Sequence, residues 1–324
     1  APTKLRRLAA IGTSIVPGIV LRGAGSYVIG EKPAARRLAI TGGIGLGAML
    51  VGGLVVGVSG GSPYTVVPGV PVLLVGAGLY VPTWFADIWV AAGGSRVTPE
   101  RRAPAPWSVE VGTTYLRDPF RKRALIRTAA TYELDKIGLG ASSLVDADGA
   151  SKTGDAEVRW RLRGSAASGA AIDYGSKLLV RAGYRIHRDD EDDVTLQTLE
   201  AELLGRLDLL YIHRAFDGNF IEISTGLGVE LATYARDAHD TGSLLLGRFA
   251  WGAYLGASEL TVFYDHRRDS LAGGFPAWRA SGFVGSFGAS TLLRVGGPFT
   301  LHAELEIGNA WVSTLALRYQ GGPP

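Results

Sequence analysis

Two segments in the middle of the chain alternate apolar and charged side chains with a period of two, and this alternation constrains the fold more than any other feature. In residues 170–186 the apolar positions are Ile172, Tyr174, Leu178, Val180, Ala182, Tyr184 and Ile186, with Lys177, Arg181 and Arg185 among the positions between them. In residues 199–211, Leu199, Leu203, Leu207 and Tyr211 oppose Glu200, Glu202, Arg206 and Asp208. Successive side chains of a strand point to opposite faces, so each segment predicts a long strand with one apolar and one charged face.

Aromatic residues on the apolar faces favour a membrane barrel over a large soluble β-sheet, which is the alternative. Tyr174 and Tyr184 share one face and would lie roughly 25 Å apart along the axis of a tilted barrel. This separation is about the height of the apolar band between the aromatic girdles of an outer-membrane barrel. The residues predicted to form the girdles are Trp107, Tyr115, Tyr174, Tyr184, Tyr211, Trp311 and Tyr319.

Ten further strand-like segments lie between Trp107 and the end of the chain, at 107–116, 123–134, 137–145, 156–166, 220–234, 242–255, 259–266, 279–295, 299–307 and 311–320. About twelve antiparallel strands are therefore expected, and an even number is what bacterial single-chain barrels require. If both ends of the barrel face the periplasm, the longer connections 117–122, 146–155, 188–193, 235–241 and 266–278 fall on the outside.

The C-terminal two thirds of the chain resembles the bacterial outer-membrane β-barrel class in its alternation, its girdle spacing and its last strand, which ends in Leu315, Leu317 and Tyr319. In that class the final strand usually ends at an aromatic residue, whereas here residues 320–324 follow Tyr319. The resemblance implies an all-β, up-and-down membrane barrel in the bacterial outer membrane, with membrane lipid as a partner. A chain that begins at Ala1 is compatible with a mature protein after removal of a signal peptide.

Residues 1–103 differ from the rest and predict a membrane-associated helical region, followed by the barrel at 104–324. An uncharged run at 38–61 and a second run at 64–89 are joined by a glycine-containing turn, which predicts an α-helical hydrophobic hairpin. A buried hairpin that does not span the membrane is the alternative. Small residues let helices approach closely in lipid, and those expected to do so are Gly43, Gly47, Gly53, Gly57 and Gly61.

If the apolar faces contact lipid, the charged faces line the barrel lumen. The residues expected to form this lumen charge cluster are Arg159, Arg161, Arg163, Lys177, Arg181, Arg185, Glu200, Glu202, Arg206, Asp208, Glu222, Glu230, Glu304 and Glu306. Charges of both signs in a narrow space pair with one another. The cluster therefore predicts either a constriction that selects small charged solutes or a salt-bridged filling that holds a closed barrel together.

Other classes of function have little support in the sequence. The net charge is only +3 and the basic residues are scattered, so nucleic acid is not an expected partner. The chain has no cysteine, and its five histidines do not follow the spacing of metal ligands. Catalytic residues, a metal and a cofactor are therefore not expected, and the protein is not predicted to be an enzyme.

The preferred hypothesis is a porin-like passive channel for small charged solutes in the outer membrane. The alternative is a non-enzymatic structural or assembly subunit, in which residues 1–103 bind envelope proteins or further copies of the chain around a closed barrel. A third hypothesis keeps the hairpin in the inner membrane and makes the β region a soluble sheet.

Overall fold

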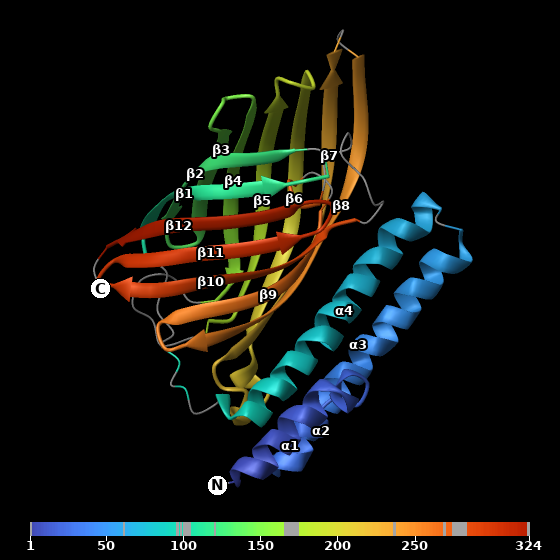
Figure 1. The fold of residues 1–324 in the computed structure, drawn as a ribbon. Helices are drawn as coiled ribbons and strands as arrows, with labels where there is room; N and C mark the ends of the chain where they lie inside the picture. Colours follow the sequence, from blue (N-terminus) through green and yellow to red (C-terminus); the bar gives the residue numbers. More distant parts are fainter. Residues whose placement is uncertain are drawn as a thin grey trace. The chain divides into compact units, whose positions relative to one another are not determined.

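The computed structural model contains a closed, up-and-down barrel of twelve antiparallel strands among its described residues (Figure 1). Each strand pairs with its neighbours in the sequence, and the first strand closes the barrel by pairing with the last. The described residues are 2–60, 62–94, 97, 99, 105–119, 121–164, 175–235, 238–267, 270–273 and 284–322. The predicted domain boundary between residues 103 and 104 and the girdle residue Tyr174 lie outside them.

The strands are β1 (Trp107–Arg117), β2 (Lys122–Glu133), β3 (Ile137–Asp146), β4 (Ser151–Arg163), β5 (Lys177–Asp189), β6 (Val194–Asp208), β7 (Asn219–Tyr234), β8 (Ala238–Leu255), β9 (Ser258–His266), β10 (Ser286–Gly296), β11 (Phe299–Ile307) and β12 (Trp311–Gly321). The twelve-strand prediction is confirmed. Barrel closure is specified by the register, in which Trp107 of β1 lies opposite Gly321 and Arg117 lies opposite Trp311 of β12.

The connections at the two ends of the barrel differ less in length than the sequence predicts. We call the end where β1 begins and β12 ends the turn end, and the opposite end the loop end. At the loop end β4 begins at Ser151 and β8 at Ala238, so the connections 147–150 and 235–237 are short. The predicted starts of these two strands, at 156 and 242, lie later in the sequence because backbone pairing continues into polar residues, where apolar alternation no longer marks it.

Side chains alternate between an apolar outer face and a polar inner face. On β1, Val109 and Val111 are exposed, whereas Glu110 and Thr114 between and beyond them are buried. β12 behaves in the same way, with exposed Leu315 and Leu317 flanking buried Ala316. Exposed apolar side chains around a closed sheet are the outer surface of a membrane barrel, because full closure leaves no strand edge in the lipid.

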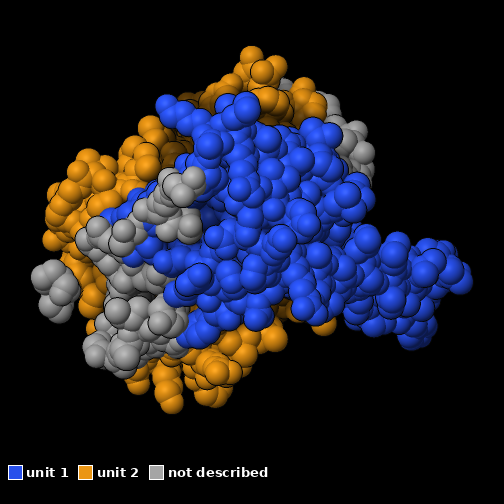
Figure 2. Space-filling model, turned by 90° about the horizontal axis from the view of Figure 1, so that it is seen from below, with its two compact units in different colours: residues 1–101, 206–223, 248–257 blue, residues 102–205, 224–247, 258–324 orange. Residues whose placement is uncertain are grey.

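The chain divides into two compact units (Figure 2). Unit 1 contains residues 1–101, 206–223 and 248–257, and unit 2 contains residues 102–205, 224–247 and 258–324. Unit 1 therefore combines the helices with parts of β6, β7 and β8. The larger part of the barrel belongs to unit 2.

The helices of unit 1 are α1 (Lys4–Ile15), α2 (Ala24–Ile29), α3 (Lys32–Val58) and α4 (Pro63–Ala92), with short 3-10 turns η1 (Pro17–Ile19), η3 (Leu209–Tyr211) and η4 (Arg214–Phe216). The predicted hairpin is present as α3 and α4. Both helices are long and apolar enough to cross a membrane. Tyr211, predicted to end a strand, instead lies in η3, because the strand stops at Asp208 and the Asp208 carboxylate accepts a hydrogen bond from Leu210 N at 2.9 Å.

Close packing of α3 on α4 depends on glycines other than the predicted ones. A Cβ at Gly45 would lie 2.7 Å from Tyr80 N, and one at Gly52 would lie 2.5 Å from Leu73 N. At Gly43, Gly47 and Gly57 an added Cβ would meet no atom within 4 Å, and at Gly53 only Leu73 Cδ1 at 3.8 Å. These positions do not form the α3–α4 contact, because each residue advances a helix by about 100° and Gly43 and Gly47 therefore face away from α4. Gly61 lies outside the described residues.

Within unit 1, α4 packs on side chains of 209–221 and of β8. Ala86 and Val90 share a buried apolar cluster with Leu209, Phe216 and Ile221. The rings of Phe85 and Trp251 stack with centroids 5.4 Å apart, and Trp89 Nε1 donates a hydrogen bond to Asp217 O at 3.3 Å. The hairpin is therefore held by buried contacts and not only by its connection to the chain.

A buried carboxylate fixes α2 to α4. Asp87 of α4 accepts hydrogen bonds from Gly25 N at 3.0 Å, Ser26 N at 2.7 Å and Ser26 Oγ at 2.6 Å. The first backbone N–H groups of a helix have no partner within the helix. Asp87 provides that partner for α2 and places negative charge where the helix dipole favours it.

Candidate functional site: the barrel lumen

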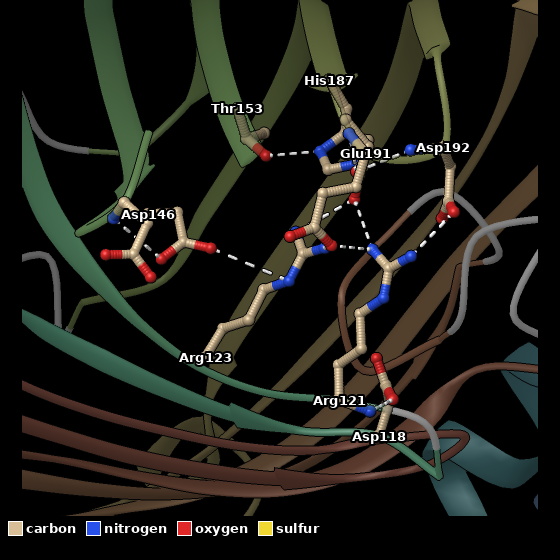
Figure 3. A network of polar contacts seen from close by, with 10 residues as sticks. Asp118, Arg121, Arg123, Asp146, Thr153, His187, Glu191 and Asp192 are labelled. Atoms are coloured by element: carbon tan, nitrogen blue, oxygen red, sulfur yellow. Dashed lines mark hydrogen bonds and ion pairs between the residues drawn. The ribbon is translucent and has the colours of Figure 1, made fainter. Parts of the chain in front are cut away.

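Charged side chains on the inner face of unit 2 form a series of ion pairs from the loop end to the turn end. The period-two alternation positions them, because every second residue of a strand points into the lumen. At the loop end, two arginines of the β1–β2 region meet carboxylates of β3, β5 and the β5–β6 connection (Figure 3). Arg123 Nη1 lies 2.9 Å from Asp189 Oδ2, and both side chains are almost fully buried, with exposures of 6% and 1%.

Arg121 extends the loop-end network beyond the strands. Its Nη2 lies 2.7 Å from Asp192 Oδ1 and its Nη1 lies 2.9 Å from Glu191 Oε2. Partial burial lowers the pKa of Arg121, but the hydrogen bond and charge of Asp192 and the charges of Asp189 and Glu191 outweigh it, so the pKa lies above its ordinary value. Arg121 therefore remains cationic, and with Arg123 it connects the β1–β2 region with the β5–β6 connection at this end of the barrel.

Residues 270–273 of the β9–β10 connection also lie inside the loop end. Ala272 is buried with Leu116, Leu125 and Val312, which point inward from β1, β2 and β12. Leu271 packs on this cluster and also on one formed by Leu196 of β6 and Ala232 of β7. In a barrel with the strand order observed, β1 and β6 stand on opposite sides, so this segment crosses the lumen. Arg267 reaches from the same connection to an ion pair with Glu200.

Glu110 is the centre of a second cluster, on the β1 side of the lumen. Its carboxylate, 2% exposed, pairs with Arg127 Nε at 2.8 Å and with Arg318 Nη2 at 2.7 Å. His302 Nδ1 lies 3.1 Å from Glu110 Oε1. Glu110 thus joins β1 to side chains of β2, β11 and β12 around the point where the barrel closes.

Arg181 of β5 occupies the middle of the opposite wall. Its Nη2 lies 2.6 Å from Glu202 and 3.0 Å from Glu200, and its Nη1 lies 3.3 Å from Glu157. Gly183 makes room for this cluster, because a Cβ there would lie 2.9 Å from Glu200 Oε1. One arginine therefore binds three carboxylates from two neighbouring strands.

Further ion pairs of unit 2 lie on either side of Arg181 along the barrel. Arg185 pairs with Asp155 of β4. Toward the turn end, Arg159 Nη2 and Arg161 Nη2 lie 2.9 and 3.4 Å from the two oxygens of Glu133. Opposite charges thus face one another across adjacent strands through the height of the lumen.

Unit 1 contains a separate cluster around Arg206. The guanidinium lies 3.4 Å above the ring centre of Phe220, and Nη2 donates a hydrogen bond to Tyr254 Oη at 2.9 Å. Arg206 Nη1 also lies 3.3 Å from Glu222 Oε1. An arginine that stacks on an aromatic face and binds a carboxylate is held in one orientation.

Between the ion pairs of unit 2 lies a cavity of about 340 Å³. Its lining includes Arg127, Arg181, Arg185, Arg318, Glu157 and Glu304, and the inserted residues Leu271 and Ala272 border it. Charges of both signs therefore face the same space, and the inserted segment forms part of its wall.

The predicted lumen residues have different surroundings in the structure. Arg159, Arg161, Arg181, Arg185, Glu200, Glu202, Arg206 and Glu222 take part in the pairs described above. Glu304 Oε2 lies 3.9 Å from His302 Nε2, Glu306 accepts a hydrogen bond from Ser286 Oγ at 2.7 Å, and Glu230 is buried. Lys177 begins β5 and is partly buried.

Two predicted lumen residues have other positions. Arg163 is exposed and does not join the lumen pairs of the described residues, because a β-bulge between Arg161 and Arg163 breaks the alternation of β4. Asp208 is fully buried at the end of β6, where its carboxylate caps η3.

Sequence reasoning missed several charged lumen residues, chiefly Glu110, Arg123, Arg127, Asp155, Glu157, Arg267 and Arg318. Alternation could have identified Glu110, which lies between Val109 and Val111, and Arg318, which lies between Leu317 and Tyr319. No alternation marks Arg267, which lies beyond the end of β9.

The girdle residues within the barrel strands mark the two ends of the apolar band. Trp107 and Tyr319 lie at the turn end with ring centroids 5.3 Å apart. Tyr115 and Trp311 are exposed near the loop end, and Tyr184 Oη donates a hydrogen bond to Gln197 Oε1 at 2.8 Å. Among the described residues, no group of three or more His, Cys, Asp or Glu side chains could hold a metal ion.

Barrel closure, an apolar outer face, aromatic girdles and a charged lumen define the bacterial outer-membrane β-barrel class, and this chain has that fold. No protein-family model and no curated protein sequence matches the chain.

Solved structures similar to the chain include three outer-membrane barrels. The KdgM porin is 7% identical with a TM-score of 0.42, covering 66% of this chain and 99% of the porin. The NanC porin is 8% identical with a TM-score of 0.41, covering 66% and 100%. The translocator domain of the autotransporter NalP from Neisseria meningitidis is 10% identical with a TM-score of 0.36, covering 72% and 93%.

Proposed function

We propose that the protein is a narrow passive channel for small charged solutes in the bacterial outer membrane. The observation that carries this proposal is the lumen cavity of about 340 Å³, which is bordered by arginines and carboxylates on facing strands. Rings of charged side chains select ions in pores because they replace part of the hydration of the ion and repel ions of like charge. The arrangement around Arg181 and Glu200 is suited to this role, and the size of the cavity favours small solutes.

Groups at the loop end obstruct the lumen and should lower the conductance of the channel. The segment 270–273 crosses the lumen, and Arg121 and Arg123 bridge β2 to the β5–β6 connection. A solute that enters from this end has to pass between these groups. The channel is therefore expected to conduct weakly, and its ion selectivity is expected to depend on the paired lumen charges.

Planar-bilayer recording of the purified, folded protein tests the proposal. Folding is verified by heat-modifiable gel mobility, so that a silent sample cannot be attributed to unfolded chains. Small ohmic steps are expected. If neither the wild-type protein nor a variant with the 270–273 segment displaced conducts, the channel function is excluded.

A second candidate function is assembly with further copies of the chain or with other envelope proteins. It is favoured by the face of α3 away from α4, where Gly43, Gly47 and Gly57 stand in open space beside exposed Ile44 and Leu54. Small residues on an exposed helix face permit close approach of another helix in lipid.

The assembly function is tested by substituting the open face while the hairpin is kept. Gly43→Leu with Gly47→Leu adds bulk away from α4, so the hairpin should persist. Light scattering in detergent then gives the number of chains per particle. A wild-type oligomer that the double variant converts to monomers supports assembly, whereas a wild-type monomer argues against assembly with further copies.

A further inference from the structure

Two basic residues at the loop end point away from the lumen. Arg117 ends β1 and Lys122 begins β2, and they lie opposite each other in the register of these strands. On the other side of Arg117 lies Trp311, the first residue of β12. Because the neighbouring Leu116 and Arg123 are buried in the lumen, alternation places Arg117 and Lys122 on the outer face of the barrel.

These cations border a cavity of about 690 Å³ on the rim of the barrel. Its other lining residues belong to the β1–β2 and β11–β12 connections, namely Asp118, Pro119, Arg121, Gly308 and Asn309, together with Trp311. The carboxylate of Asp118 accepts a hydrogen bond from Arg121 N at 2.5 Å. Arg121 itself is engaged with Glu191 and Asp192.

Arg117 and Lys122 have no hydrogen-bonding or ion-pair partner for their side chains among the described residues. They differ in this from Arg121 and Arg123, which are bound to carboxylates. Two cations beside one cavity repel each other unless an anion lies between them. The lining holds three cations, Arg117, Arg121 and Lys122, against the one carboxylate of Asp118, so the rim cavity carries the net positive charge of an anion site.

The level of the rim cavity identifies the kind of anion. Trp311, 57% exposed, and Tyr115 form the loop-end girdle directly beside the cations, and exposed Val111 and Leu315 continue the apolar face toward the turn end. Aromatic girdles mark the boundary between hydrocarbon and headgroups. Arg117 and Lys122 thus stand at the level of lipid headgroups, with the acyl-chain region beginning at Trp311.

We propose that the rim cavity binds the phosphate of a membrane lipid headgroup. The planar Arg117 guanidinium can bind two phosphate oxygens, and the Lys122 ammonium contributes a point charge. The acyl chains of the same lipid would lie along Trp311 and the apolar face below it. If the turn end, where β1 begins and β12 ends, faces the periplasm, the loop end and this lipid lie at the outer leaflet. The proposal is independent of whether the lumen conducts.

The proposal is tested by native mass spectrometry of the folded protein in detergent, with bisphosphorylated lipid A as the probe and its dephosphorylated form as the comparison. The wild-type protein should retain one lipid A with at least tenfold higher affinity than the dephosphorylated form. Arg117→Ala with Lys122→Ala should remove at least tenfold of the affinity for lipid A. Lys152→Ala is the matched control, because Lys152 is an exposed loop-end lysine that lies 3.8 Å from Asp190 and does not line the cavity.

Equal retention of lipid A by the wild-type protein and the double variant would overturn the proposal. A second arm uses inorganic phosphate alone. If millimolar phosphate displaces lipid A and binds to the wild-type protein with the same dependence on Arg117 and Lys122, the site takes a free anion and the lipid assignment is wrong. Arg117→Gln with Lys122→Gln, which keeps side-chain length closer to the original, replaces the alanine variant if heat-modifiable mobility shows that the latter does not fold.

Discussion

Arg181 of β5 and Glu202 of β6 lie 2.6 Å apart, and the same guanidinium also binds Glu200 and Glu157. One cation is therefore surrounded by three carboxylates on the wall of the lumen cavity. Glu200 also pairs with Arg267 and Glu157 with Arg159, whereas Arg181 is the cation that contacts all three carboxylates. The balance of charge in the lumen is consequently sensitive to substitution at Arg181.

Arg181→Glu should shift the channel strongly toward cations. The substitution removes the cation that contacts Glu157, Glu200 and Glu202 together, and it adds a fourth carboxylate. Reversal potentials in a salt gradient across a planar bilayer measure the change. Arg188→Glu is the control, because Arg188 is 65% exposed at the loop end and pairs only with Asp190 among the described residues. Equal reversal potentials for the two variants would show that Arg181 does not line the conduction path.

Arg123→Ala should lower the free energy of unfolding by about 3 kcal/mol, since removal of one partner leaves a buried charge uncompensated. Asp189, which is 1% exposed, would lose its partner at 2.9 Å and keep the more distant Arg121 at 3.5 Å. Buried Asp146 would lose its contact with Arg123, whereas Glu191 would keep its pair with Arg121. Denaturant unfolding of the barrel in lipid vesicles, followed by tryptophan fluorescence, measures the loss. Arg188→Ala, in the exposed pair of Arg188 with Asp190, should lower the free energy of unfolding by less than about 1 kcal/mol. A similar loss in both variants would contradict a structural role for the loop-end network.

Most of the barrel could be predicted from the sequence because its strands are long and each has one face in lipid. Period-two alternation is obligatory there, so Val158, Trp160 and Leu162 identify β4 without any further information. The charged lumen follows from the same pattern. Pairing partners do not, because Arg181 meets Glu202 only through the register of β5 with β6, which no local pattern specifies.

Other features had no signal in the sequence. The insertion of residues 270–273 depends on contacts of Ala272 with Leu116 and Val312, residues far apart in the chain. The choice of Gly45 and Gly52 over Gly43 and Gly47 depends on the rotation of α3 about its axis, and glycines occur on several faces of this helix. A four-residue glycine spacing therefore identified the helix but not the face that contacts α4.

Ala272→Asp should increase the conductance of the barrel. Ala272 is 1% exposed among apolar side chains of β1, β2 and β12, and a carboxylate placed there without a partner is costly. The inserted segment should therefore leave its position and widen the path. Single-channel recording measures the change, and heat-modifiable mobility shows whether the barrel stays folded. A folded variant with unchanged conductance would show that residues 270–273 do not restrict permeation. Ala272→Ser, which keeps the volume small and adds no charge, is the control.

The α3–α4 hairpin should respond differently to leucine at two nearby glycines. Gly45→Leu places side-chain atoms where a Cβ alone would lie 2.7 Å from Tyr80 N and 2.8 Å from Gly76 O. The backbone of α4 cannot yield to this as a flexible side chain would, so α3 and α4 must separate, at a cost of about 1–3 kcal/mol. Gly47→Leu meets no atom within 4 Å of its Cβ and replaces a poor helix former with a good one.

Closure of the hairpin can be measured by cross-linking, since the chain has no cysteine of its own. A disulfide between cysteines introduced at Val56 and Gly69, which are in contact, reports hairpin closure. Cross-linking should fall with Gly45→Leu and persist with Gly47→Leu, and the reverse order would mean that the opposite face of α3 contacts α4.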